Sequence, residues 1–247
     1  MRIGLASYPF VNNDVDHNLA QMEAALRLAQ GKVELLCFGE AFLQGFDALR
    51  WNYADDKHIA LPIDSAPMRH AARLSLTYGV GLLFGYIERQ EDWIYSSCAV
   101  MDGGALLYNY RRISRGWKDF RRTDGHYREG TETGAFWYRK RPLTVALCGD
   151  LWDFPERFRW GCPLIWPVYV NFSLQEWAKN EADYARQAQL AAPQTLMVNS
   201  LSENPRSYGG AFYFAGGQVR RKISYGIAGM MTIEVLNDNG IPDLMRR

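Results

Sequence analysis

The feature that most constrains the fold of this chain is a repeated alternation of apolar, strand-like runs with segments of helical periodicity. Residues 33–38 and 164–170 are near-continuous apolar runs of strand length, and each lies beside a helix-like segment. Runs that are apolar throughout are typical of strands buried on both faces of a sheet. Because the pattern occurs twice, each time followed by a hairpin-like pair of strands, it predicts an α/β fold of two similar halves.

The individual elements follow from apolar spacing and turn residues. The first half contains predicted strands at residues 3–7, 33–38, 80–87, 96–101 and 105–110, and helices through residues 19–29 and 67–78. The second half contains predicted strands at residues 143–147, 164–170, 195–199, 209–215, 218–224 and near 230–236, and a helix from about 175 to 191. Since no linker or shift in composition interrupts the chain, we expect one domain over residues 1–247, with two sheets stacked face to face and helices outside.

Composition narrows the classes of function. The formal net charge is only +1, so there is no electrostatic case for binding nucleic acid or an anionic membrane. No apolar run approaches the roughly 18 residues of a membrane span, and the N-terminus does not have the pattern of a signal peptide. The four cysteines show neither metal-binding spacing nor the density of a disulfide scaffold. These observations predict a cytoplasmic protein that holds no metal.

Cys148 is the candidate nucleophile. It directly follows the apolar strand-like run 143–147 and precedes the turn-forming pair Gly149-Asp150. A rigid strand end followed by a tight turn can present a thiol to a substrate, and cysteine is the side chain that needs least activation to act as a nucleophile. Asp150 is expected to fix the turn after the nucleophile.

Short motifs in a fixed order carry a resemblance to a known family. They are Leu35-Leu36-Cys37-Phe38-Gly39-Glu40 with Gly45-Phe46, Gly85-Tyr86-Ile87-Glu88 with Tyr95-Ser96, Tyr110-Arg111-Arg112-Ile113-Ser114, Cys148-Gly149-Asp150-Leu151 with Phe154-Pro155-Glu156, and Ala185-Arg186 through Asn199 with Tyr208-Gly209-Gly210-Ala211. In this order and spacing, the chain resembles the carbon–nitrogen hydrolase (nitrilase) superfamily from end to end. The match is imperfect, because Gly39 stands where the family usually has proline.

The resemblance implies a fold, an active site and an assembly. The fold would be a four-layer α-β-β-α sandwich, and members of the family usually pair, so we expect a homodimer. The family uses a Glu-Lys-Cys triad without a cofactor, in which Cys148 would be the nucleophile and Glu40 the base. The backbone N–H of Gly149 could contribute to an oxyanion hole, and Trp152 could line the substrate pocket.

The sequence differs from the family pattern at the position of the triad lysine. Alignment on Tyr110 places Arg112 at the lysine position, and an arginine is a fork-shaped cation that does not release its proton. Lys118 lies six residues later, and a local shift of the loop could bring it into the vacant place. We favour Lys118 as the triad cation, with Arg112 contacting substrate. Glu129 falls where a second acidic residue often assists in this family.

The expected activity is hydrolysis of a non-peptide carbon–nitrogen bond in a small molecule, through a cysteine thioester with a Glu base and a Lys cation. The substrate would be a small amide, a carbamoyl compound or a nitrile. One alternative is a catalytically silent relative that serves as a binding or structural subunit, which the Arg112 replacement suggests. Another is a glutamine-hydrolysing subunit that supplies ammonia to a second enzyme.

Overall fold

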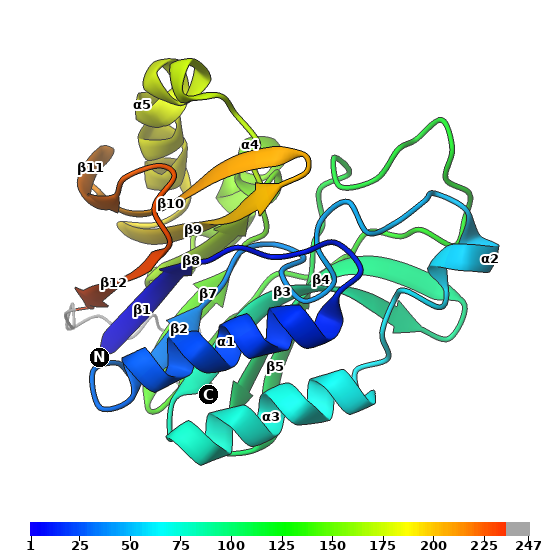
Figure 1. The fold of residues 1–247 in the computed structure, drawn as a ribbon. Helices are drawn as coiled ribbons and strands as arrows, with labels where there is room; N and C mark the ends of the chain where they lie inside the picture. Colours follow the sequence, from blue (N-terminus) through cyan, green and yellow to red (C-terminus); the bar gives the residue numbers. More distant parts are fainter. Residues whose placement is uncertain (236–247) are drawn as a thin grey trace.

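The computed structural model describes residues 1–235, which form two six-stranded sheets with helices outside them (Figure 1). The first sheet has the strand order β12-β1-β2-β3-β4-β5. Its strands are β1 (Arg2–Ser7), β2 (Leu35–Cys37), β3 (Gly81–Gln90), β4 (Trp93–Asp102), β5 (Ala105–Arg111) and β12 (Gly229–Glu234). The three strands β1, β2 and β3 run parallel to one another, and the others pair antiparallel.

The second sheet repeats this arrangement with the order β11-β10-β9-β8-β7-β6. Its strands are β6 (Ala135–Tyr138), β7 (Arg141–Val145), β8 (Leu164–Val168), β9 (Gln194–Glu203), β10 (Arg206–Ala215) and β11 (Gln218–Ile223). Here β7, β8 and β9 are the parallel strands. The predicted central runs, residues 33–38 and 164–170, contain β2 and β8, which are interior strands of their sheets, so this prediction is confirmed.

Helices cover the outer faces of both sheets. Figure 1 shows α1 (Val15–Ala29) and α3 (Ala66–Tyr78) side by side along the first sheet, and α5 (Leu174–Ala191) beyond the second. Three shorter helical segments lie in the connections, namely α2 (Tyr53–Asp56), α4 (Asp150–Asp153) and η1 (Pro155–Phe158). Helix α5 begins with a capping box in which Ser173 and Glu176 satisfy each other's backbone N–H groups.

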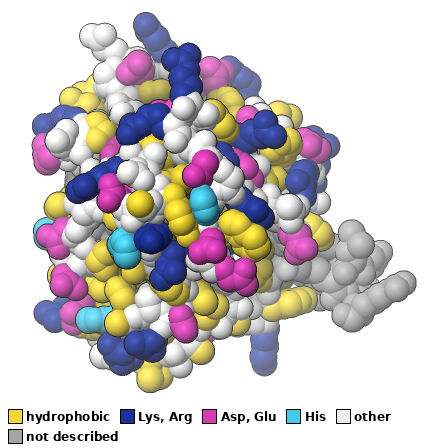
Figure 2. Space-filling view, turned by 90° about the vertical axis from the view of Figure 1, so that its right-hand side faces the viewer, with side chains coloured by type: hydrophobic (Ala, Val, Ile, Leu, Met, Phe, Trp, Pro, Cys, Tyr) yellow, Lys and Arg dark blue, Asp and Glu magenta, His cyan; other side chains and the backbone are white. Residues whose placement is uncertain are grey.

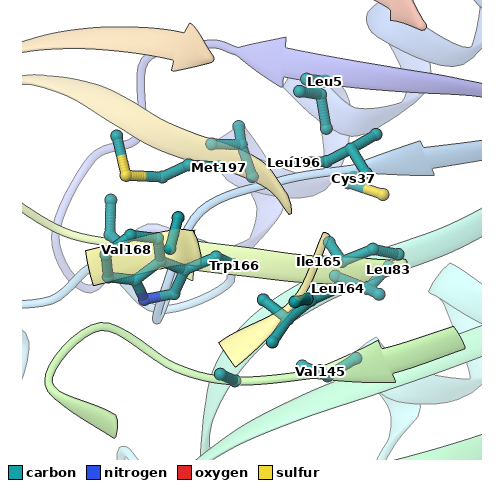
Figure 3. Close-up of a cluster of buried hydrophobic side chains, with 14 of the residues drawn as sticks. Leu5, Cys37, Leu83, Val145, Leu164, Ile165, Trp166, Val168, Leu196 and Met197 are labelled. Carbon is teal, nitrogen blue, oxygen red and sulfur yellow. The ribbon is translucent and has the colours of Figure 1, made fainter. Parts of the chain in front are cut away.

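One hydrophobic core joins the two sheets. Leu5, Cys37 and Leu83 project from the first sheet toward Val145, Ile165 and Leu196 of the second, and all of them are fully or almost fully buried (Figure 3). The four-layer α-β-β-α sandwich expected from the sequence is therefore the observed fold.

The sequence did not predict every element. Strand β6 was not expected, because it is only four residues long and comes directly after the polar, glycine-punctuated segment 111–133. The last strand, expected near residues 230–236, is β12, but it returns to the first sheet and pairs antiparallel with β1 instead of extending the second half. The end of that expected strand, Leu236, lies outside the described residues.

The surface carries charges of both signs. Lys and Arg side chains are interspersed with Asp and Glu on the face seen in Figure 2, which agrees with a net charge of only +1. Within residues 1–235, none of the helices combines the length and apolar character needed to cross a membrane.

Candidate active site

The candidate nucleophile and base lie beyond the carboxyl ends of two parallel strands, one in each sheet. Glu40 follows β2 by three residues, and Cys148 follows β7 by three residues. Sites in α/β folds commonly form at such strand ends. The chain at Glu40 approaches the second sheet closely, since Glu40 N donates to Val168 O at 3.2 Å. A Cβ at position 39 would lie 2.3 Å from Ser200 Oγ, so glycine replaces the family's proline where the two sheets meet.

Cys148 has a strained backbone that its neighbours hold in place. Its φ angle is +38°, which is uncommon for a residue other than glycine. Its N–H donates to Pro167 O at 3.0 Å, and its carbonyl oxygen accepts from Trp166 Nε1 at 2.9 Å. The Sγ atom lies 3.8 Å from Tyr169 O. Such strain persists only where the surroundings over-determine it, and here it turns the thiol toward Glu40 and Arg112.

Asp150 ties the nucleophile turn to the end of β5. One carboxylate oxygen accepts the N–H groups of Ile113 and Ser114, at 3.0 and 2.8 Å. The other accepts Tyr110 Oη at 2.6 Å and Leu147 N at 2.8 Å. All four bonds are satisfied within the protein and Asp150 is fully buried, so its structural role, expected from the sequence, is confirmed.

Arg112 contacts Glu40 directly inside the protein. Its Nη1 lies 2.9 Å from Glu40 Oε1, and the two side chains are 3% and 0% exposed. The same Oε1 also accepts Ser96 Oγ at 2.8 Å, while Arg112 Nε donates to Ser114 Oγ at 2.7 Å. The second oxygen, Glu40 Oε2, is buried and has no hydrogen-bond partner among the described residues. It is therefore available to accept a proton or a substrate N–H.

Gly149 makes room for the guanidinium group. A Cβ at this position would lie 2.4 Å from Arg112 Nη2 and 3.0 Å from Ser114 Oγ. Real Cβ atoms do not approach other heavy atoms so closely, so the arginine occupies space that any larger residue at 149 would fill. The arginine at position 112 and the glycine after the nucleophile are thus structurally coupled.

The structure does not bring Lys118 to Glu40, contrary to the expectation from the sequence. Lys118 Nζ pairs with Glu129 Oε1 at 2.8 Å and donates to Tyr127 O, which keeps it within its own loop. Arg112 occupies the place beside Glu40 instead. The physical reason is that the end of β5, fixed by Asp150, directs Arg112 inward to Glu40.

Glu129 and Trp152, the remaining side chains expected in the site, contact residues other than Glu40 and Cys148. Glu129 is the ion-pair partner of Lys118 and is 23% exposed. Trp152 lies on α4, where its ring packs edge-on against Tyr184 of α5 at 5.0 Å and stays 42% exposed.

Neighbouring charges and burial set the protonation states. Burial, and then the negative charge of Glu40, raise the pKa of Cys148 to about 12, although Arg112 acts in the opposite direction. Burial disfavours the charge on Arg112, but Glu40, Cys148 and Asp150 together outweigh it and leave the arginine pKa raised. At neutral pH the site therefore holds a protonated thiol and a permanent cation, and the thiol needs a base before it can attack.

Sequence reasoning missed two contributors. Ser96 donates to Glu40, and its only signal was its place after Tyr95 in a family motif. Tyr169 places its carbonyl near the thiol, and its ring stacks on Phe46 at 4.7 Å. Such a role for a backbone carbonyl leaves no signal in the sequence. Among residues 1–235, the structure contains no cluster of three or more His, Cys, Asp or Glu side chains suited to a metal ion.

Comparison with known sequences includes the central residues of the site in a family match. A family model for carbon-nitrogen hydrolases matches residues 2–160, which include Glu40, Arg112 and Cys148. The glutamine-dependent NAD(+) synthetase of Thermotoga maritima is 29% identical over 161 residues, which make up 62% of this chain and 26% of that protein. The alignment thus spans about a quarter of that relative's length.

Solved structures show the same fold. A CN-hydrolase superfamily protein from Xanthomonas campestris, with an arsenic adduct in its active site, has a TM-score of 0.75 and 19% identity, covering 94% of this chain and 89% of that one. An amidase from Nesterenkonia sp. AN1, in a structure showing acrylamide added at the active-site cysteine, has a TM-score of 0.76 and 16% identity, covering 96% and 93%. With the family model matching well over half of its length, this chain belongs to the carbon-nitrogen hydrolase family.

Proposed function

We propose that this protein is a thiol hydrolase that cleaves a non-peptide carbon–nitrogen bond in a small amide, carbamoyl compound or nitrile. Cys148 is the nucleophile, Glu40 is the base, and Arg112 takes the place of the triad lysine. The observation that carries this proposal is the buried contact between Arg112 and Glu40, which assembles a cation and a base beside a strained, partly exposed cysteine.

For an amide, the first half of the reaction forms a thioester. Glu40 Oε2 removes the proton from Cys148 Sγ as the sulfur attacks the substrate carbonyl carbon. Negative charge develops on the carbonyl oxygen, where the guanidinium group of Arg112 and the N–H of Gly149 stabilise it. Glu40 then gives its proton to the departing nitrogen. The carbon–nitrogen bond breaks, ammonia or an amine leaves, and the acyl group stays on Cys148.

The second half returns the enzyme to its starting state. Glu40 accepts a proton from a water molecule, whose oxygen attacks the thioester carbon. When the carbon–sulfur bond breaks, the thiolate leaves and recovers the proton from Glu40, and the carboxylic acid product is released. Arg112 keeps its proton throughout because its pKa is raised, so it contributes charge and hydrogen bonds without transferring protons.

A panel of primary amides, N-carbamoyl amino acids and nitriles tests this function. We expect ammonia release from at least one compound and, after acid quenching, a mass increase equal to its acyl group on the peptide that contains Cys148. Cys148→Ala should show neither signal while remaining folded. Turnover that survives in Cys148→Ala would rule out the thioester route.

A catalytically silent binding subunit is the second candidate, and the same ion pair motivates it. A carboxylate held by a buried arginine at 2.9 Å could be fixed as a structural anion and not act as a base. In that case no compound of the panel would be turned over, and Cys148 would react with iodoacetamide no faster than a free thiol.

A further inference from the structure

The parallel hydrogen bonds between β7 and β8 continue past the end of β7 as far as Cys148. Ala146 N donates to Ile165 O at 3.1 Å, and two residues later Cys148 N donates to Pro167 O at 3.0 Å. At Cys148 the backbone then turns away from the strand direction, because its φ angle is +38°. The carbonyl of a residue in such a turn needs a hydrogen-bond donor from outside the regular strand pairing.

Trp166 supplies that donor. Its indole Nε1 lies 2.9 Å from the carbonyl oxygen of Cys148. Trp166 belongs to β8, its side chain is fully buried, and its ring packs at 5.4 Å against Tyr184 of α5. An indole offers one donor and no acceptor, so this N–H is committed to the Cys148 carbonyl. Close packing around the ring fixes the direction of the donor.

The residues that follow Trp166 contact both the proposed nucleophile and the proposed base. Val168 O accepts the backbone N–H of Glu40 at 3.2 Å. Tyr169 O lies 3.8 Å from Cys148 Sγ. Residues 166–169 therefore form a frame to which the backbones of Cys148 and Glu40 are both attached. The position of Sγ relative to Glu40 depends on how firmly the turn at Cys148 is held to this frame.

The far end of this frame is anchored to β9. Asn199 Oδ1 accepts Val170 N at 2.9 Å, and Asn199 Nδ2 donates to Val170 O at 2.9 Å. Asn199 is fully buried on an interior strand, so the frame is fixed in place at residue 170. The hydrogen bond from Trp166 to Cys148 then connects this fixed frame to the carbonyl side of the nucleophile turn.

We propose that Trp166 is a positioning residue for the hydrolysis. Its indole N–H holds the Cys148 carbonyl, keeps the turn in its left-handed conformation and so directs Sγ toward Glu40. Without this bond, the strained turn loses one of the contacts that maintain it, and the thiol adopts orientations from which it does not attack. This inference rests on the proposed function and adds a residue that acts only through the backbone of the nucleophile.

Trp166→Phe and a matched control test the proposal. With the most active amide of the panel, Trp166→Phe should lower kcat about tenfold or more and leave KM within about threefold, because the reacting thiol is displaced while the substrate contacts remain. Alkylation of Cys148 by iodoacetamide at pH 7 should slow about fivefold or more, on the scale of one lost hydrogen bond. Trp177→Phe removes an equally buried indole, whose Nε1 has no hydrogen-bond partner among residues 1–235, and should leave kcat and alkylation near the wild-type values.

A tryptophan isostere separates the hydrogen bond from the packing of the ring. Site-specific incorporation of 3-benzothienylalanine at position 166 keeps the shape of the side chain and replaces the ring N–H with sulfur. We expect the same losses of kcat and alkylation rate as in Trp166→Phe. This protein also provides the answer if Trp166→Phe does not fold, because it leaves no cavity between β8 and α5.

The outcomes separate this inference from the proposed function. Equal losses in Trp166→Phe and Trp177→Phe, or wild-type kcat and alkylation with the isostere, would overturn the role of the indole N–H while the thiol hydrolase stands. A higher KM with an unchanged kcat would also contradict it. If the wild-type protein hydrolyses no amide, the proposed function fails. The alkylation rates need no substrate and then decide by themselves whether Trp166 orients the thiol.

Discussion

At the scale of single residues, the site is defined by contacts among Arg112, Ser114 and Gly149. Arg112 stands where the resemblance to the family places a lysine. Arg112 donates to Ser114 Oγ, and its Nη2 occupies the space next to Gly149. A guanidinium group is larger and more directional than an ammonium group. It therefore requires the space that Gly149 leaves free and the hydrogen-bond acceptor that Ser114 Oγ provides.

Removing the cation is expected to stop the chemistry. Arg112→Ala should lower kcat by about a hundredfold or more, the scale of losing one oxyanion-stabilising group. It should also destabilise the protein by roughly 3–5 kcal/mol, because Glu40 is left as an unpaired buried charge. Stopped assays for ammonia and urea unfolding measure the two effects. Near-parental turnover in a folded Arg112→Ala protein would show that another group acts as the cation.

The space at Gly149 gives a second prediction. Gly149→Ala places a Cβ 2.4 Å from Arg112 Nη2, which must push the guanidinium group away from Glu40. We expect kcat to fall at least tenfold while iodoacetamide still alkylates Cys148. Gly125→Ala is the matched control, because a Cβ there meets nothing within 4 Å. Equal activities for the two variants would contradict the coupling between positions 112 and 149.

At the scale of elements, the strand ends were predictable from sequence and the loop over residues 111–134 was not. Apolar runs located β2 and β7, although β7 (Arg141–Val145) begins and ends two residues before the expected run 143–147, and Glu40 and Cys148 each follow their strand by three residues. The loop takes its path from tertiary contacts, including the Lys118–Glu129 pair and the hydrogen bond of Tyr127 to Asp56. Polar loop residues carry no periodicity that reveals such partners, and Lys118 was therefore assigned to the wrong place beside Glu40.

The position of Lys118 implies a supporting role for this loop. Lys118→Met breaks the pair with Glu129 and the contact with Tyr127 O, next to Trp117 in the chain. We expect kcat for a productive amide to stay within about threefold of the wild-type value, because the pair is partly exposed and joins residues of the same loop. Glu129→Gln should give the same phenotype. A hundredfold loss of kcat in Lys118→Met would instead restore Lys118 as the catalytic cation.

At the scale of the whole molecule, buried thiols make stability depend on pH. Burial raises the pKa of Cys148 to about 12 and that of Cys162 to about 11, and it also raises the pKa of Cys37 and Cys98. The unfolded chain loses these protons near pH 9, before the folded protein does. It therefore binds fewer protons than the folded protein above that pH, and the free energy of unfolding should decrease as pH rises from 9 toward 12.

Urea unfolding at pH 7, 9 and 10.5, with a reductant present, measures this dependence. The decrease between pH 9 and 10.5 should be smaller in Cys148→Ala, which lacks one of the four groups. A free energy of unfolding that stays level or increases over that interval would show that the thiols are not protonated in the folded protein.

Assembly is a further property of the whole molecule, and we propose that the protein is a homodimer. Trp152 of α4 and Leu174 and Leu190 of α5 leave large apolar side chains exposed on the helices that cover the second sheet. Sedimentation at micromolar concentration should show a dimer, and Trp152→Glu should shift it toward monomer. Leu28→Glu, at an exposed leucine of α1, should leave the dimer intact. A wild-type protein that sediments only as a monomer would overturn the proposal.

The rate at which iodoacetamide alkylates Cys148 at pH 7, in wild-type protein and in Glu40→Gln, tests the central claim most directly. The charge of Glu40 raises the pKa of Cys148, so removing it should by itself increase the thiolate fraction and speed alkylation. If Glu40 acts as the base that removes the thiol proton, Glu40→Gln should instead alkylate at least tenfold more slowly. Peptide mapping assigns the label, and Cys148 is the one of the four cysteines that is partly exposed, whereas the other three are buried. Equal or faster alkylation in Glu40→Gln would contradict the assignment of Glu40 as the base and favour the silent subunit.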